Sequence, residues 1–199
     1  VTALTIEKSL KVFLEEAQNG NYSNDYVDSN HLQQNEFFFR KLSGIGKNSS
    51  YTFNSPNVLK SYNSDHENYM VTVAFTGTKN DIPFVYQITE FLAKPYKDHY
   101  RFYCPFIENT RNFKTKTFDQ VTYHYSGNLN EVKAHEFVEF KNNLSNLTKT
   151  PKSNLDYYCF QSLDELLKSY GFLFSARQCN FLCYDLGFMD QNAQAYVTG

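Results

Sequence analysis

The sequence predicts an α+β protein in which N-terminal helices pack on a curved antiparallel sheet and a smaller α/β segment follows. Two observations support this fold class. Aromatic residues make up 18% of the 199 residues, with 19 Phe, 16 Tyr and no Trp, and such rings favour strands because they cover half-buried pleated surfaces. In addition, a helical apolar pattern near the N-terminus precedes long apolar alternations that are separated by short polar turns.

The N-terminal segment predicts a helix over residues 4–17, ended by Gly20 as its C-cap. Its apolar residues recur at helical spacing: Leu4, Ile6, Leu10, Phe13, Leu14 and Ala17. A second helix is predicted over about 31–43, where "SGIG" ends the pattern. Both helices have an apolar side, which requires a sheet to cover it.

Three long strands are predicted next, within residues 68–79, 82–94 and 99–107, joined by the turns "GTKND" and "PYKD". Tight turns between long strands are typical of an antiparallel meander. A short earlier strand is expected within "SYTFNSPNVLKSY". On the first strand, one face is expected to hold Tyr69, Val71, Val73 and Phe75. On the second, Phe84, Tyr86 and Ile88 are expected on one face and Val85, Gln87 and Thr89 on the other. On the third, Tyr100, Phe102, Cys104 and Phe106 are expected on one face and Arg101 and Tyr103 on the other.

The polar stretch "ENTRNFKT" marks a boundary, which divides the chain into domains 1–112 and 113–199. Beyond it, "KTFDQVTYHYSG" predicts one strand, residues 128–149 an amphipathic helix, "LDYYCF" a buried strand, "SLDELLKSYGF" a helix and "FLCYDLGF" another short element. Ser162 and Glu165 have the spacing of a helix capping box. The alternation of strands and helices is typical of an α/β segment.

Two helices followed by a long antiparallel sheet resemble the nuclear transport factor 2-like (cystatin-like) fold over roughly residues 1–110. In that family the sheet wraps a helix and often leaves a pocket between them. Some members are enzymes and many are accessory or ligand-binding modules, so the resemblance implies a fold and does not imply an activity.

Residues 114–199 resemble the leading segment of gluzincin-type (peptidase MA-like) zinc metallopeptidases. The phrases that carry the likeness are "TYHY", the Asp-Tyr-Tyr at 156–158 and the Ser-Leu-Asp-Glu-Leu at 162–166. In that group a His-Glu-x-x-His helix and a later Glu ligand follow such phrases. We therefore expect no cofactor in this chain. The partner is left open among a downstream peptidase domain, which the resemblance suggests, another protein and a small-molecule ligand.

The charge and hydropathy of the sequence limit its partners and predict its location. The net charge is −2, and no basic cluster alternates with aromatic residues as in a nucleic-acid groove. No apolar run reaches the ~18–20 residues that a transmembrane helix needs. Val1 in place of Met indicates that either a leader or an upstream tag was removed, and the final "AYVTG" suggests a fragment of a longer protein. We expect an extracytoplasmic bacterial protein, periplasmic or on the cell surface.

A zinc site is considered at "AHEFVEF", because His135 and Glu136 open it and Glu139 stands where a zinc peptidase has its second His. We expect a solvent-exposed helix face here, with Val132, Phe137, Phe140, Leu144 and Leu147 forming the apolar face of the same helix. The other histidines, His31, His66, His99 and His124, have no ligand spacing. The four cysteines, Cys104, Cys159, Cys179 and Cys183, are predicted to be buried free thiols.

Acid–base candidates are predicted to be solvent-facing: Asp81 and Glu90 flank strands, Asp98-His99 lies in a turn, and Asp65-His66-Glu67 forms a polar loop. No phosphate-binding loop or nucleophile motif is present, so the sequence contains no complete catalytic site.

The candidate ligand-binding residues are aromatic rings of the meander, which either line a cleft against helix 31–43 or fill the core. These six residues are Tyr69, Phe84, Tyr86, Tyr100, Phe102 and Tyr103.

Three functional hypotheses follow. The first is a non-catalytic accessory or binding module of a secreted or surface bacterial protein, forming the N-terminal portion of a gluzincin-like metallopeptidase. The second is a small-molecule binding protein that uses an aromatic-lined pocket. The third is a zinc hydrolase that uses His135 and Glu139, and it leaves open whether the chain is an enzyme.

Overall fold

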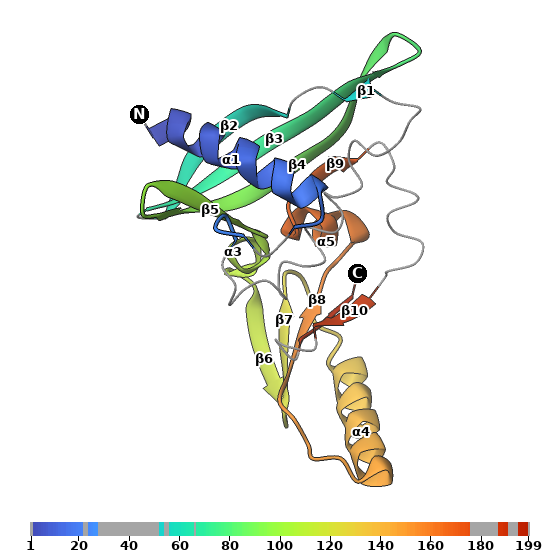
Figure 1. Cartoon of the computed structure of the whole chain (residues 1–199). Coiled ribbons are helices and arrows are strands. Elements are labelled where there is room, and N and C mark those ends of the chain that lie inside the picture. The colour runs from blue at the N-terminus through green and yellow to red at the C-terminus, as the bar shows by residue number, and fades with distance from the viewer. Residues whose placement is uncertain are drawn as a thin grey trace. The chain divides into compact units, whose positions relative to one another are not determined.

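The structure is a computed structural model of the chain, shown in Figure 1, and it describes residues 2–21, 24–27, 52–53, 56–65, 67–175, 187–190 and 195–198. Within these residues the protein is α+β, with four helices and two sheets, as expected at that level. One unit comprises the described residues up to Asn109 together with 167–175. The other comprises 110–166 and the two short strands near the C-terminus. The helix predicted at 31–43 lies outside the described residues.

Helix α1 (Thr2–Gln18) confirms the first predicted helix. Five of its predicted apolar residues are buried, namely Ile6, Leu10, Phe13, Leu14 and Ala17. Gly20 ends the helix with φ of 79°, since its amide donates to the Ala17 carbonyl and the next amide, of Asn21, donates to the Glu16 carbonyl. This pair of bonds is the Schellman arrangement, which needs a left-handed residue at the position of Gly20.

The sheet of the first unit is antiparallel throughout and contains six strands. Their bounds are β1 (Thr52–Phe53), β2 (Asn57–Asp65), β3 (Asn68–Lys79), β4 (Ile82–Tyr96), β5 (His99–Tyr103) and β9 (Phe172–Ser175). Strands β1 and β2 both pair with β3, and β5 and β9 both pair with β4. The long β3–β4 hairpin is therefore the centre of the sheet, as Figure 1 shows.

Both predicted turns of the meander are two-residue hairpin loops. Lys79 pairs with Ile82 across Asn80 and Asp81, and both loop residues have positive φ, of 51° and 62°. Positive φ at both positions is characteristic of a type I′ turn, whose twist matches that of the flanking strands. The second loop places Lys97 at φ 52° between Tyr96 and His99, which pair with each other.

The pairing of β3 with β4 has an irregularity that the sequence did not predict. Phe75 pairs with Gln87 and Thr76 with Val85, so Tyr86 is an extra residue without a partner in the ladder. Such a bulge shifts the faces on either side of it. As a result Gln87 and Thr89 are buried, and their side chains bond to each other at 2.6 Å.

The third strand is shorter than predicted and ends at Tyr103. Pro105 follows, and it has no amide hydrogen to donate to a ladder. The Pro105 carbonyl accepts from Asn109 and a short helix, α3 (Phe106–Thr110), begins. Cys104 and Phe106 therefore do not share a strand face with Tyr100 and Phe102, and the Phe106 ring contacts Tyr170 instead, with centroids 4.5 Å apart.

The sheet of the second unit is mixed and has the strand order β10-β11-β8-β7-β6. The bounds are β6 (Lys114–Phe118), β7 (Val121–Tyr125), α4 (Glu131–Thr148), β8 (Leu155–Cys159), α5 (Leu163–Ser169), β10 (Gly187–Asp190) and β11 (Ala195–Thr198). Strands β7 and β8 are parallel and are joined through α4. The prediction of a single strand over 116–127 is wrong, because Asp119 adopts φ 52° and turns the chain so that Phe118 pairs with Val121.

The two helices α4 and α5 both begin with side-chain caps. Asn130 accepts the Lys133 amide at the start of α4. At α5 the Ser162 hydroxyl accepts the Glu165 amide, and the Glu165 carboxylate accepts the Gln161 amide. The predicted capping box is thus confirmed, with the carboxylate reaching one residue further back than Ser162. "LDYYCF" forms β8, whose side chains are half-buried instead of fully buried.

Gly171 lies in close contact with the backbone of Glu90 in the first unit. Its φ is 84°, its carbonyl accepts the Glu90 amide at 2.7 Å, and a Cβ here would lie 2.3 Å from the Glu90 carbonyl oxygen. Gly20 has a similar φ of 79°, but a Cβ there would meet nothing within 4 Å. A substitution at Gly20 therefore tests the cost of the left-handed backbone alone, whereas a substitution at Gly171 adds steric overlap to that cost.

We predict that Gly171→Ala destabilises the first unit far more than Gly20→Ala. Left-handed backbone costs an L-residue about 1–2 kcal/mol, which is the whole cost expected at Gly20. The overlap with Glu90 adds to it at Gly171, so we expect a loss of roughly 3 kcal/mol or more there. Urea unfolding followed by circular dichroism measures both losses, and equal losses would show that Gly171 is not in close contact.

Candidate functional site

One face of the second unit's sheet brings together His124 of β7 and Asp156 and Tyr158 of β8. Val121 and Tyr123 pack in the core with α4, so the alternation of β7 puts His124 on the opposite face. His124 Nε2 lies 2.7 Å from Asp156 Oδ1. The Tyr158 ring stacks on the imidazole with centroids 4.4 Å apart and planes inclined by 9°. The carboxylate is half-exposed and the imidazole about one-fifth exposed.

The pair has a defined chemical capacity. A neutral imidazole has one N–H group, and donation from Nε2 to Asp156 leaves Nδ1 as an acceptor. Among the described residues Nδ1 of His124 has no hydrogen-bond partner. An imidazole oriented by a carboxylate can accept a proton or bind an electron-poor atom. Burial, and then the charge of Asp156, raises the pKa of Tyr158.

This pair was not predicted from the sequence, because only candidate site residues that lie close together in the sequence were considered. His124 and Asp156 are 32 residues apart, and only the parallel register of β7 and β8 makes them neighbours. The available signal was that "TYHY" and "LDYY" both alternate polar and aromatic residues. Two such strands joined by a helix are expected to lie side by side in a βαβ unit.

Glu90 is a buried carboxylate in the middle of β4, whereas the sequence predicted a strand-flanking, solvent-facing residue. The same oxygen, Oε1, accepts from the Tyr62 hydroxyl at 3.3 Å and from the Thr72 hydroxyl at 3.2 Å. Burying a carboxylate is costly unless donors compensate for lost water, and these two hydroxyls serve that purpose. Burial, followed by the negative charge of Glu90, raises the pKa of Tyr62. The arrangement accounts for Glu90 as a structural group.

The six aromatic candidates do not lie together. Tyr100 and Phe102 are buried on the face of the sheet that holds α1, where Phe102 stacks on Phe13 at 5.0 Å. Tyr69 contacts the edge of Tyr100 at 5.9 Å. Phe84 and Tyr86 contact each other nearer to the β3–β4 turn, and Tyr103 alternates to the other face of β5. Ligand binding by these rings stays a prediction, and the helix expected to complete their cleft lies outside the described residues.

The zinc-peptidase-like phrase lies on α4 with its polar residues exposed, as predicted. His135, Glu136 and Glu139 are all exposed. The His135 ring packs on Phe118 with centroids 4.2 Å apart, and Glu136 pairs with Lys133 at 2.6 Å. Within the described ranges no group of three or more His, Cys, Asp or Glu side chains has a geometry that could hold a metal ion.

The apolar face predicted for α4 is largely wrong. The helix packs on its sheet through Ala134 and Val138, whose small side chains allow the Tyr123 hydroxyl to reach the Ala134 carbonyl at 2.9 Å. Phe137 is partly buried against Tyr157. The remaining predicted residues point to solvent: Val132 is 68% exposed, Phe140 62%, Leu144 48% and Leu147 82%. The helix therefore has a narrow buried side and a separate exposed apolar stripe, formed by Phe140, Leu144 and Leu147.

Cys104 and Cys159 are free thiols, and Cys179 and Cys183 lie outside the described residues. The Cys104 thiol donates to the Tyr170 carbonyl at 3.8 Å, and burial raises its pKa to about 12. Cys159 packs against the core of the second unit, and burial raises its pKa to about 11. Neither thiol carries an appreciable thiolate fraction near neutral pH.

Among the described helices, none is sufficiently long and apolar to cross a bilayer.

We predict that both thiols resist alkylation in the folded protein. Thiolate is the reactive form, and an ordinary Cys has a pKa near 8.5. At pH 8 iodoacetamide should therefore modify Cys104 on the order of a thousandfold more slowly in native protein than in urea, and Cys159 on the order of a hundredfold more slowly. Peptide mass spectrometry at timed intervals measures both rates. Comparable rates with and without urea would contradict the burial of these sulfur atoms.

No protein-family model, curated protein or solved structure matches this chain. The resemblances to nuclear transport factor 2-like domains and to gluzincin peptidases therefore rest on element order and on short phrases of the sequence. The functional proposal rests on those phrases and on the side chains described above.

Proposed function

We propose that this chain is a non-catalytic accessory module that binds a helix of another protein segment through the exposed apolar stripe of α4. The observation that carries the proposal is the stripe itself. Phe137, Phe140, Leu144 and Leu147 have the 3-4-3 spacing of a heptad seam. Only Phe137 is covered by its own unit, and the other three side chains are exposed.

The energetic argument concerns the apolar area that faces water. Burying a Leu or Phe side chain stabilises by about 1.5–3 kcal/mol. Three such side chains in a row form a contiguous patch, and contiguous apolar patches on folded proteins mark interaction sites. The interior of the unit does not use them, since Ala134 and Val138 already cover the sheet. The stripe is therefore available to a partner.

The occupant that fits is an amphipathic helix with apolar residues at heptad spacing. A seam of this kind accepts side chains of a second helix between its own. Lys133 lies one turn before Phe137, at the end of the seam, and Glu136 flanks the seam, with side chains 71% and 56% exposed. A partner helix with an acidic residue facing Lys133 and a basic residue facing Glu136 would complete the rim, because flanking charges select the partner of a helical seam.

The fold families of the two units and the type of protein that contains this chain are also part of the proposal. We assign the first unit to the nuclear transport factor 2-like fold, and the second to the leading part of a gluzincin-like domain in a secreted or surface bacterial protein. One helix on an antiparallel sheet and the β7–α4–β8 crossover agree with these assignments, and the phrases at 156–158 and 162–166 support the second. The partner helix then belongs to the peptidase portion of that protein.

If the gluzincin-like assignment holds, we predict that the gene encodes, downstream of the codon for Gly199, a His-Glu-x-x-His helix followed by a Glu ligand. Sequencing the complete gene tests this directly. A frame that continues without the motif would remove the peptidase from the proposal, and the downstream polypeptide would still be the partner tested for docking on α4. A frame that ends at the codon for Gly199 would remove both the peptidase and its partner helix.

We predict that Leu144→Lys and Leu147→Lys each weaken binding to the separately expressed downstream polypeptide roughly ten- to a hundredfold, since each loses about 1.5–3 kcal/mol of burial. Asn146→Lys adds the same charge at an exposed position on another side of the helix, outside the stripe and its flanking positions, and should bind as the unchanged chain does. Isothermal titration calorimetry measures the affinities, and circular dichroism checks that all variants are folded.

Two outcomes would contradict the choice of occupant. Unchanged affinity of both Leu variants would show that the stripe does not contact the partner. Concentration-dependent dimerisation of the chain alone in analytical ultracentrifugation, abolished by Leu144→Lys, would show that a second copy covers the stripe instead.

A further inference from the structure

The turn Asn24–Val27 is fastened to the edge strand β5 of the first unit. Within the turn, the Asn24 side chain accepts the Tyr26 amide at 2.8 Å and the Asn24 carbonyl accepts the Val27 amide at 3.1 Å. Across to the strand, the Phe102 amide donates to the Tyr26 carbonyl at 2.9 Å. Val27 is buried. The turn is thus held by a backbone bond and by the side chains of β5.

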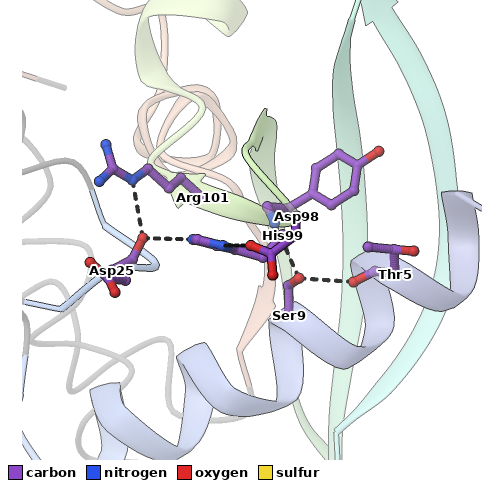
Figure 2. Close-up of polar contacts among 7 residues, drawn as sticks. Thr5, Ser9, Asp25, Asp98, His99 and Arg101 are labelled. Carbon is purple, nitrogen blue, oxygen red and sulfur yellow. Dashed lines mark hydrogen bonds and ion pairs between the residues drawn. The ribbon is translucent and has the colours of Figure 1, made fainter.

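Two side chains of β5 converge on one carbonyl of this turn, as Figure 2 shows. His99 Nε2 lies 3.1 Å from the Asp25 carbonyl oxygen, and Arg101 Nε donates to the same oxygen at 3.0 Å. The other ring nitrogen of His99, Nδ1, lies 3.2 Å from Asp98 Oδ1. The imidazole therefore bridges a backbone carbonyl and a carboxylate.

The chemistry of the ring decides how many of these bonds form. A carbonyl and an ionised carboxylate accept hydrogen bonds and cannot donate them. A neutral imidazole has one N–H and can satisfy only one of the two acceptors, whereas the imidazolium has an N–H on each nitrogen. The observed geometry, with an acceptor facing each nitrogen, is therefore complete only when His99 carries a proton on both.

Among the described residues, the groups that contact the His99 ring come from the turn, from the end of β4 and from the neighbouring Asp98. The turn contributes the Tyr26 ring at 4.9 Å and the Asp25 backbone, and the end of β4 contributes the Tyr96 ring at 5.5 Å. Two cations lie on Tyr96, with the Arg101 guanidinium 3.5 Å and the Lys97 ammonium 5.0 Å from its centroid. Helix α1 faces the next residue, Tyr100, through the uncharged Ser9, which bonds back to the Thr5 carbonyl.

Among the described residues, the charged side chains on the segments that contact the ring are those of Asp98, Asp25, Arg101 and Lys97, and Asp25 contacts the ring through its backbone carbonyl. Of these, Asp98 bonds to the ring directly, and the hydrogen bond from His99 holds the pKa of the Asp98 carboxyl below its ordinary value. Asp98 remains ionised through the whole range in which histidine side chains titrate. It is therefore a constant acceptor for the imidazolium.

We propose that His99 is a proton-dependent latch that fastens the turn Asn24–Val27 to β5. When the ring is protonated, it holds both the Asp25 carbonyl and Asp98. When it is neutral, one of these bonds is lost, and the Arg101 and Phe102 amide bonds remain. The latch is complete at the acidic end of the histidine range and loosens as pH rises through it.

The test is amide hydrogen exchange of the full chain followed by NMR between pH 5.5 and 8, corrected for the intrinsic pH dependence of exchange. The Phe102 and Val27 amides report opening of the turn. We expect their protection factors to fall about three- to tenfold as pH rises, the effect of one net hydrogen bond. His99→Gln should remove this pH dependence, and His124→Gln, which changes a carboxylate-paired histidine of the other unit, should leave it intact.

Asp98→Asn provides a second variant in case His99→Gln fails to fold, because the Asp98 side chain is 95% exposed. Replacing the carboxylate with a neutral amide removes the charge that favours the imidazolium, so the pH dependence should shrink. The latch is refuted if protection at these amides does not change with pH in the unaltered chain. It is equally refuted if the change persists undiminished in the His99 variant or, where that variant does not fold, in the Asp98 variant.

Discussion

The contact of Phe13 with Phe91 and Phe102 is the interaction on which the first unit depends. The Phe13 ring lies edge-on to Phe91 at 5.7 Å and stacks on Phe102 at 5.0 Å, and all three side chains are buried. Aromatic pairs of this kind contribute about 0.5–1.5 kcal/mol beyond the area they bury. Because Phe13 fixes α1 on the sheet, Ser9, one turn earlier, reaches the Tyr100 amide. The start of β5, where His99 lies, is therefore positioned by the same packing.

The titratable groups of the two units are satisfied in contrasting ways. Glu90 is buried and is compensated by two hydroxyl donors within its own sheet. His99 and His124 each meet a carboxylate at a partly exposed position, where solvent can exchange protons with the ring. The Glu90 carboxylate is thus satisfied inside the core, whereas the two histidine–carboxylate pairs are open to solvent. The surfaces of interest in this protein are accordingly α4 and the two histidine sites, and the core supports them.

Local patterns predicted a substantial part of the fold. Helix α1 and its Gly20 cap, the Asn80–Asp81 turn and the Ser162–Glu165 capping box all agree with the structure, because residues within a few positions of one another determine each of them. The β6–β7 hairpin was missed because Phe118 and Val121 were assigned to one strand, although the three-residue step between them breaks the period of two that a single strand requires. The candidate site was not predicted at all, because His124 and Asp156 become neighbours only through parallel pairing.

By itself the sequence determined the α+β class, the central meander and the ends of several elements, since helical periodicity, alternation and turn chemistry act over short distances. Only the tertiary structure decided which side of α4 is buried, because that depends on the space the sheet leaves: Ala134 and Val138 fit close to Tyr123, while Phe140 and Leu147 are left in solvent. It also decided that β9 pairs with β4, which places Gly171 against Glu90. Such contacts join residues far apart in the chain, and no local pattern encodes which distant surface will be their neighbour.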